Sequence, residues 1–321
     1  MSTNQDRHPA FAKKLANTPM GRIAYLEAGA ADAPAVLFVH GIPTSGALWR
    51  HVMRALEGRF RCIAPDLMGL GDTVVDPRAD LSMPAQAEML LELLDALGVR
   101  RAHVVAHDQG GAAGQILAVR HGHRVDRLVL TDCVCYDNWP VPVIRRLQLF
   151  SRVPLLPDLA ASTGLIELLE ARTRLSAFRR GYQDPGRIDR GIVAEYLRPL
   201  RAGSVERERF LAFLRAGSPR HTMAVARGLK EIACPTLILW AQGDRYIPTS
   251  WARRLHGDIP GARLEIVPGA GHFWPDELPG PFADRIGEFF DAPLVDEPSE
   301  RAARKSLKCS MPRTREEEVC S

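Results

Sequence analysis

Short apolar segments alternate with amphipathic segments along most of this 321-residue chain, and this alternation limits the possible folds more than any other feature. The apolar segments predict buried strands at 21–29, 35–40, 62–67, 102–107, 126–132, 236–244 and 262–272. Helices are predicted between several of these strands, at 82–98, 110–121 and 249–256. Because parallel strands need long connections, which are usually helices, this order predicts an α/β fold with a mostly parallel central sheet flanked by helices.

One part of the chain departs from this alternation. Between 137 and 226 the pattern is helical and punctuated by prolines, without a convincing strand, which predicts an inserted helical cap. The sheet domain is therefore expected in two parts, 1–136 and 227–291. The remaining residues, 292–321, are charged and lack hydrophobic periodicity, so we expect a disordered C-terminal tail.

Composition and charge argue against several classes of function. A net charge of +4 is too small to indicate a nucleic-acid partner. No apolar run approaches the roughly 18–20 residues of a membrane span, and the polar N-terminus lacks the apolar core of a signal peptide. The six cysteines form no CxxC pair and have no metal-like spacing with histidine. We therefore expect a cytoplasmic protein, monomeric or homodimeric, that acts on a small molecule and contacts neither nucleic acid nor membrane.

The segment VVAHDQGGAAG, at 104–114, predicts a strand that runs through a glycine-flanked turn into a helix. Asp108 stands at this turn, where a nucleophile would be presented at the carboxyl edge of the sheet. The backbone N–H of Gln109 is a candidate oxyanion donor, and that of Ile42, in the loop HGIPTSGALWR, is the second. Taken alone, an aspartate at this position could equally be a helix cap.

Five motifs extend this interpretation, in the order AVLFVHGIPTSGALWR, CIAPDLMGLGDT, VVAHDQGG, LWAQGD and PGAGHFW. Together they resemble the α/β-hydrolase fold and, more narrowly, its branch with an aspartate nucleophile, the epoxide hydrolases and haloalkane dehalogenases. The resemblance covers roughly residues 20–290 and is loose over the predicted cap. It implies a catalytic triad of Asp108, Asp244 and His272, in the chain order of nucleophile, acid and histidine.

The chemistry of a carboxylate agrees with this resemblance. A carboxylate suits attack on an electrophilic sp³ carbon, because attack on an acyl carbonyl would give a mixed anhydride. Asp108 would become an alkyl ester, and His272 would activate water against that ester while Asp244 orients the imidazole. Asp132, after the preceding strand, is an alternative acid, since some haloalkane dehalogenases resemble that arrangement. Water, the carboxylate and the imidazole suffice, so we expect no metal and no organic cofactor.

The electrophile itself is less constrained by the sequence. An epoxide needs an acid for its departing oxygen, and epoxide hydrolases use two cap tyrosines. Tyr136, Tyr182 and Tyr196 are candidates, although the segment 210–217, where the second tyrosine is expected, contains none.

A halide would need hydrogen-bond donors instead. The resemblance to haloalkane dehalogenases implies two such donors. One is a tryptophan directly after the nucleophile, and the other is either an asparagine after the HG pair or a second tryptophan in the cap. Here Gln109 and Ile42 occupy the first two positions, so only the Gln109 amide and the Trp139 indole could donate. We therefore favour an epoxide hydrolase, with a haloalkane dehalogenase as the alternative.

A different class of function stays open, because a fold does not fix a function. Some proteins of this fold are ligand receptors or signalling partners, and others are lyases or oxygenases without a cofactor. A receptor has no need of a general base, so the complete set of two carboxylates and a histidine argues against pure binding.

Overall fold

The computed structural model describes residues 11–153, 155–163, 176–201 and 203–293. Most of the predicted tail, and residues 164–175 of the predicted cap, lie outside the described residues. The chain divides into two units, Met1–Phe290 and Asp291–Ser321, and the features below belong to the first. No helix in the described ranges is long and apolar enough to cross a membrane.

The described residues form a nine-stranded sheet in the order β1-β2-β4-β3-β6-β7-β8-β9, with β5 paired to β2. The strands are β1 (Lys14–Thr18), β2 (Gly21–Ala28), β3 (Ala35–Val39), β4 (Arg61–Pro65), β5 (Val74–Val75), β6 (Ala102–Asp108), β7 (Val125–Cys133), β8 (Thr236–Ala241) and β9 (Arg263–Val267). The pairs that involve β2 are antiparallel, and those from β4 through β9 are parallel. The predicted α/β fold with a mostly parallel sheet is confirmed.

Helices cover both faces of the sheet, which explains why its strands are apolar at successive positions. The helices α2 (Met83–Ala96), α3 (Gln109–Arg120) and α12 (Thr249–Asp258) pack on one face, where they meet side chains such as Leu37 and Val39. On the other face, α1 (Arg50–Leu56) and α14 (Pro279–Asp291) meet Phe38 and its neighbours.

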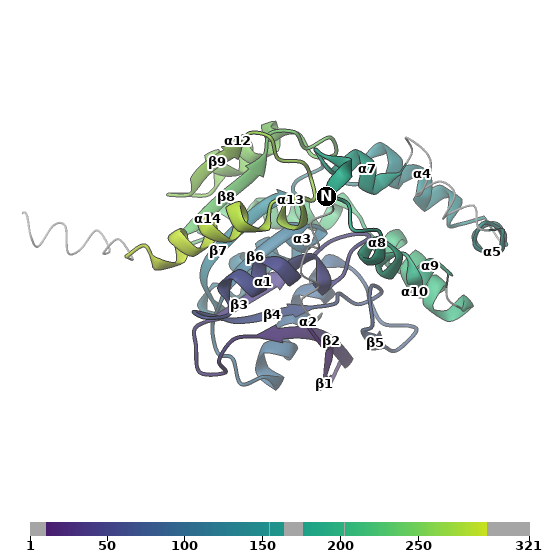
Figure 1. The fold of residues 1–321 in the computed structure, drawn as a ribbon, viewed down its shortest axis with the longest axis horizontal. Coiled ribbons are helices and arrows are strands. Elements are labelled where there is room, and N and C mark those ends of the chain that lie inside the picture. Colours follow the sequence, from purple (N-terminus) through teal and green to yellow (C-terminus); the bar gives the residue numbers. More distant parts are fainter. Residues whose placement is uncertain (1–10, 154, 164–175, 202, 294–321) are drawn as a thin grey trace, which may run out of the picture. The chain divides into compact units, whose positions relative to one another are not determined.

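A group of helices follows β7 and precedes β8, and Figure 1 shows it gathered on one side of the sheet. Its helices are α4 (Pro142–Phe150), α5 (Leu156–Ser162), α7 (Ala177–Gly181), α8 (Arg190–Tyr196), α9 (Arg198–Arg201), α10 (Ser204–Ala216) and α11 (Pro219–Ala226). The remaining short elements are η1 (Gly46–Trp49), η2 (Gly122–Arg124), η3 (Pro185–Arg187), η4 (Leu229–Glu231) and α13 (Trp274–Glu277). We refer to the helices from α4 to α11 named above as the cap helices. The predicted cap boundaries of 137 and 226 stay predictions.

The cap helices are bound to the sheet domain through α13. The buried carboxylate of Glu277 accepts hydrogen bonds from the backbone N–H groups of Gln183 (3.0 Å) and Asp184 (2.6 Å). The hydroxyl of Tyr182 donates to Asp276, whose carboxylate also lies 2.6 Å from the guanidinium of Arg50. This connection lies directly after His272 in the chain, so it fixes one edge of the cap helices beside the candidate site.

Candidate active site

Asp108 occupies a tight turn between β6 and α3. Its backbone has φ 51° and ψ −123°, a conformation that a side chain disfavours, so the surrounding structure must impose it. Close packing does so: a Cβ on Gly110 would lie 2.5 Å from the carbonyl oxygen of Val39, and one on Gly111 would lie 2.0 Å from the Cβ of Cys133. The two glycines therefore allow α3 to start against the neighbouring strands.

The two oxygens of the Asp108 carboxylate have different environments. Oδ1 accepts hydrogen bonds from the backbone N–H groups of Gln109 (2.6 Å) and Ile42 (3.2 Å). Oδ2 lies 3.5 Å from Nε2 of His272. The carboxylate is buried, and Gly41 leaves room for it, because a Cβ there would lie 2.2 Å from Oδ1. One oxygen is thus held by two backbone donors while the other faces an imidazole.

His272 is held on its other side by Asp244. Its Nδ1 lies 2.8 Å from Oδ2 of Asp244, and Oδ1 of that carboxylate accepts from the backbone N–H groups of Tyr246 (2.7 Å) and Ile247 (3.0 Å). The structure therefore brings the sequence-predicted residues Asp108, His272 and Asp244 into one chain of contacts.

The charges in this chain of contacts support one another. Burial alone would lower the pKa of His272, but the carboxylates of Asp244 and Asp108 outweigh it and raise that pKa well above its usual value. Burial would likewise raise the pKa of Asp244, but the charge of His272 and three hydrogen bonds hold it below its usual value. The site at rest favours an imidazolium between two carboxylates.

Asp132, the alternative acid, makes other contacts. Its Oδ1 accepts from the backbone N–H of Ala241 (3.0 Å), and its Oδ2 accepts from the indole of Trp274 (2.8 Å) and the hydroxyl of Thr131 (2.7 Å). Complete burial and the nearby charge of Asp244 raise its pKa well above the usual value. Asp132 therefore ties the end of β8 to the sheet, and Asp244 is the carboxylate that binds His272.

Two further histidines hold loops beside the site. Nδ1 of His40 binds the carbonyl oxygen of Gly41 (3.0 Å), and its Nε2 accepts from the backbone N–H of Leu67 (3.0 Å). Nε2 of His107 binds the carbonyl oxygen of His272 (2.8 Å), and burial lowers the pKa of His107 to about 3. Both rings therefore act as neutral struts.

The three candidate tyrosines fall into two groups. The hydroxyl of Tyr136 donates to Asp258 (2.6 Å), at the last residue of α12, and the hydroxyl of Tyr182 donates to Asp276. Tyr196 stacks on Phe178, and its buried hydroxyl has no hydrogen-bond partner in the described part of the chain. Burial and the charge of Asp276 raise the pKa of both Tyr182 and Tyr196, so these two tyrosines lie near one carboxylate, whereas Tyr136 lies apart at the end of α12.

The two candidate halide donors do lie near each other. The side-chain amide of Gln109 and the indole nitrogen of Trp139 are buried, and neither has a partner within the described ranges. Both border Gly217, since a Cβ on that glycine would lie 2.6 Å from Nε1 of Trp139 and 3.5 Å from Nε2 of Gln109. Sequence reasoning named both donors but missed Gly217, whose only signal was its position after the helical run of α10.

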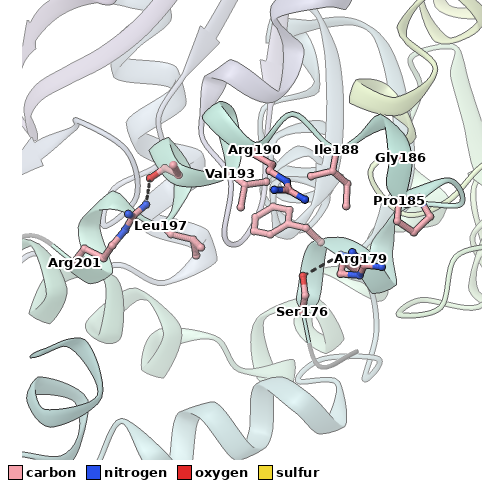
Figure 2. Close-up of a pocket in the computed structure, with 11 residues that line it drawn as sticks. Ser176, Arg179, Pro185, Gly186, Ile188, Arg190, Val193, Leu197 and Arg201 are labelled. Carbon is pink, nitrogen blue, oxygen red and sulfur yellow. Dashed lines mark hydrogen bonds between the residues drawn. The ribbon is translucent and has the colours of Figure 1, made fainter. Parts of the chain in front are cut away.

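A separate cavity of about 300 Å³ lies among the cap helices (Figure 2). Its walls include Phe178 and Leu197, and the exposed side chains of Arg179 and Arg190 stand at its edge. None of the three residues joined through His272 lines it. Within the described residues, no cluster of histidine, cysteine and acidic side chains is arranged to hold a metal ion.

The fold and the turn at Asp108 define the class of protein, and comparison with known families agrees. The chain belongs to the alpha/beta hydrolase fold family, whose model matches residues 34–277. It is 32% identical over 267 residues to the putative carbamate hydrolase RutD of Caulobacter sp. strain K31, covering 81% of this chain and 91% of that protein. It is also 29% identical over 295 residues to haloalkane dehalogenase 2 of Mycobacterium tuberculosis H37Rv, covering 87% and 95%.

Comparison with solved structures shows the same fold. The epoxide hydrolase CorEH superposes with a TM-score of 0.72 at 23% identity, covering 87% of this chain and 98% of that one, which is evidence of fold alone. The curated relatives thus include a putative carbamate hydrolase as well as a haloalkane dehalogenase, and the family shared with this chain is the alpha/beta hydrolase fold.

Proposed function

We propose that this protein is a hydrolase that forms an alkyl ester on Asp108 and then hydrolyses that ester. One observation carries the proposal: the two oxygens of Asp108 have divided surroundings, with Oδ1 on two backbone N–H groups and Oδ2 facing His272. A helix cap alone would not require the second oxygen to lie beside a histidine that is itself bound to a buried carboxylate.

In the first step, Oδ2 attacks an electrophilic sp³ carbon in line with its leaving group. A new carbon–oxygen bond forms. In an epoxide the electron pair of the broken bond stays on the ring oxygen, which takes up a proton from water, whereas in a haloalkane the pair departs with the halide. Oδ1 then becomes the carbonyl oxygen of the ester. Because it already lies on the N–H groups of Ile42 and Gln109, the same donors would stabilise the oxyanion that forms when water attacks the ester carbon.

Alkylation also prepares His272 for the second step. The negative charge of Asp108 and its contact with Nε2 are among the causes that raise the pKa of His272. Esterification removes that charge, so the pKa falls and the imidazole can lose its proton and act as a base. Asp244 remains to stabilise the imidazolium that forms when His272 takes a proton from water.

For the electrophile, we place an epoxide first, because His272 pairs with Asp244, the acid position that resembles that of epoxide hydrolases. A haloalkane is the second candidate, since the donors of Gln109 and Trp139, which have no partner among the described residues, would suit a leaving group that only accepts hydrogen bonds. The engagement of Tyr136 and Tyr182 with carboxylates also weighs toward this second candidate.

The test is to trap the ester in a His272→Gln variant, which keeps Asp108 but lacks the base. The variant is incubated with a panel of terminal epoxides and primary haloalkanes, and its intact mass is measured. An adduct with the whole mass of an epoxide would identify an epoxide hydrolase, and an alkyl adduct with free halide would identify a dehalogenase.

The matched control is the double variant Asp108→Ala/His272→Gln, in which we expect no adduct. Asp108→Ala alone should keep its circular dichroism spectrum and lose turnover by several powers of ten. If no panel member labels His272→Gln at Asp108, the proposal is wrong, and a receptor, lyase or oxygenase would be the better account.

A further inference from the structure

A buried group of polar atoms lies next to the nucleophile and is not used in the chemistry above. It consists of the side-chain amide of Gln109 and the indole N–H of Trp139, which we call the polar corner. The two residues are 1% and 4% exposed, and none of these three polar atoms has a hydrogen-bond partner in the ranges that the structure describes. Their contacts with the Cβ position of Gly217 place the two nitrogens no more than about 6 Å apart.

Such atoms are costly to bury, because they lose their hydrogen bonds to water. A second buried glutamine shows how the chain can avoid this cost. Gln86, which is equally buried, accepts from the backbone N–H of Met68 (2.9 Å) and donates to the carbonyl oxygen of the same residue (3.0 Å). The contrast between Gln86 and Gln109 indicates that the polar corner is arranged for a group that is not part of the protein.

The residue types define the complementary group. A glutamine amide presents one acceptor and one N–H₂ donor whichever way it is turned, and an indole only donates. A halide or a carboxylate could accept from both nitrogens but would leave the Gln109 oxygen unpaired. A hydroxyl group is neutral and can both accept from the donors and donate to that oxygen.

The glycine at position 217 bears on the same group. Gly217 has φ −63° and ψ 116°, a conformation open to any residue, so its backbone does not require glycine. What the glycine does is leave the volume between the two polar side chains free of a methyl group.

We propose that the polar corner binds a hydroxyl group of the substrate, so the preferred electrophiles are small epoxy alcohols or halogenated alcohols. This inference rests on the proposed function, because the polar corner begins at the residue whose backbone N–H holds Oδ1 of Asp108. Binding the hydroxyl would orient the neighbouring carbon toward the nucleophile.

The test uses substrates that differ only by a hydroxyl in place of a methyl group. One pair is glycidol and 1,2-epoxybutane, and the other is 3-bromo-1-propanol and 1-bromobutane. In the reactive pair, we expect the hydroxylated member to have a kcat/KM roughly 10- to 100-fold higher, because the apolar member leaves the buried amide unpaired. Gln109→Met and Trp139→Phe should each reduce this ratio toward one.

Trp251→Phe is the matched control, because Trp251 stacks on Tyr136 outside the polar corner and its replacement should leave the ratio unchanged. If the wild type has equal kcat/KM for both members of a pair, or if Gln109→Met keeps the ratio, the polar corner does not bind a hydroxyl. The proposed function would stand in that case.

A second measurement does not depend on ester formation. The indole N–H signal of Trp139, assigned by its loss in Trp139→Phe, is followed by NMR during titration of the wild type and of Gln109→Met with glycerol, the hydrolysis product of glycidol. We expect glycerol to shift this signal in the wild type at a lower concentration than in Gln109→Met. Equal or absent shifts would overturn the hydroxyl site, whereas a wild-type shift without any adduct would keep the site and overturn the proposed function.

Discussion

The backbone N–H of Gln109 and the side chain of the same residue differ in how completely the protein satisfies them. The backbone N–H lies 2.6 Å from Asp108, within a set of contacts in which His272 and Asp244 also have partners. The side-chain amide, a few bonds away, has none in the described ranges. The difference separates two tasks. Groups that would act on every substrate have hydrogen-bond partners within the protein, and groups that would select a substrate would gain their partner from the substrate.

The largest effect should come from the groups that already have hydrogen-bond partners within the protein. Asp244→Asn removes the charge that holds the imidazolium of His272, so we expect kcat/KM to fall by roughly 10³- to 10⁴-fold. The measurement is steady-state kinetics with the most reactive member of the trapping panel.

Asp132→Asn is the matched control for that loss. Asp132 binds Ala241, Trp274 and Thr131 instead of the histidine, so its replacement should lower stability by about 1–3 kcal/mol and change kcat/KM by less than tenfold. A larger kinetic loss in Asp132→Asn than in Asp244→Asn would reverse the assignment of the acid.

Intermediate effects are expected at two glycines. Gly41 lies against the Asp108 carboxylate, and Gly217 lies against the polar corner. Gly41→Ala places a methyl group 2.2 Å from Oδ1 of Asp108, so it should displace the carboxylate from the Ile42 N–H and lower kcat by roughly 10²- to 10³-fold on all substrates.

Gly217→Ala places its methyl group 2.6 Å from the Trp139 nitrogen. We expect it to spare the apolar substrates and to reduce activity selectively on their hydroxylated counterparts. Equal losses on both kinds of substrate for Gly217→Ala would mean that the polar corner and the catalytic contacts of Asp108 do not act independently.

The smallest effect concerns pH and the neutral strut at His107. Burial holds the pKa of folded His107 at about 3, whereas the unfolded chain takes up this proton near pH 6.5. The unfolding free energy therefore falls as the pH drops from 6.5 toward 3, by up to about 1.4 kcal/mol per pH unit from this group. His107→Gln can keep a donor to the His272 carbonyl without titrating, so urea unfolding between pH 6.5 and 5 should show a shallower slope.

His40 and His103, whose pKa values are also lowered, remain in both proteins and cancel in this comparison. The absolute stability of His107→Gln is not the test, because the lost ring contacts of His107 with Trp49 and Phe273 lower it at every pH. An unchanged slope would mean that His107 is not kept neutral by the fold.

Most of the sheet could be predicted because its strands are buried on both faces and therefore apolar throughout. The predicted strand at 126–132, for example, corresponds to β7 at Val125–Cys133, and the predicted helix at 110–121 corresponds to α3 at Gln109–Arg120. β1 was not predicted, because KLANT has no such pattern and becomes a strand only by pairing in register with β2. Strand order likewise depends on contacts between distant segments.

The same distinction applies to the candidate site. The turn at Asp108 could be predicted because the glycines that permit it follow directly in sequence. The surroundings of the tyrosines could not, because Tyr136 binds Asp258 across 122 residues and Tyr182 binds Asp276 across 94. That the Gln109 amide lacks a partner among the described residues is also a three-dimensional property, since it depends on every chain segment that packs nearby.

The attachment of the cap helices to Glu277 has a consequence for engineering. Glu277 is 3% exposed, and its carboxylate is satisfied by the backbone N–H groups of Gln183 and Asp184. A chimera that exchanged 137–226 for the cap of a relative would leave this buried carboxylate without hydrogen-bond partners unless the new cap offered two backbone N–H groups at the same place. Pairing such a graft with Glu277→Gln or Glu277→Leu is therefore the practical route to transplanting new substrate-facing surfaces onto this scaffold.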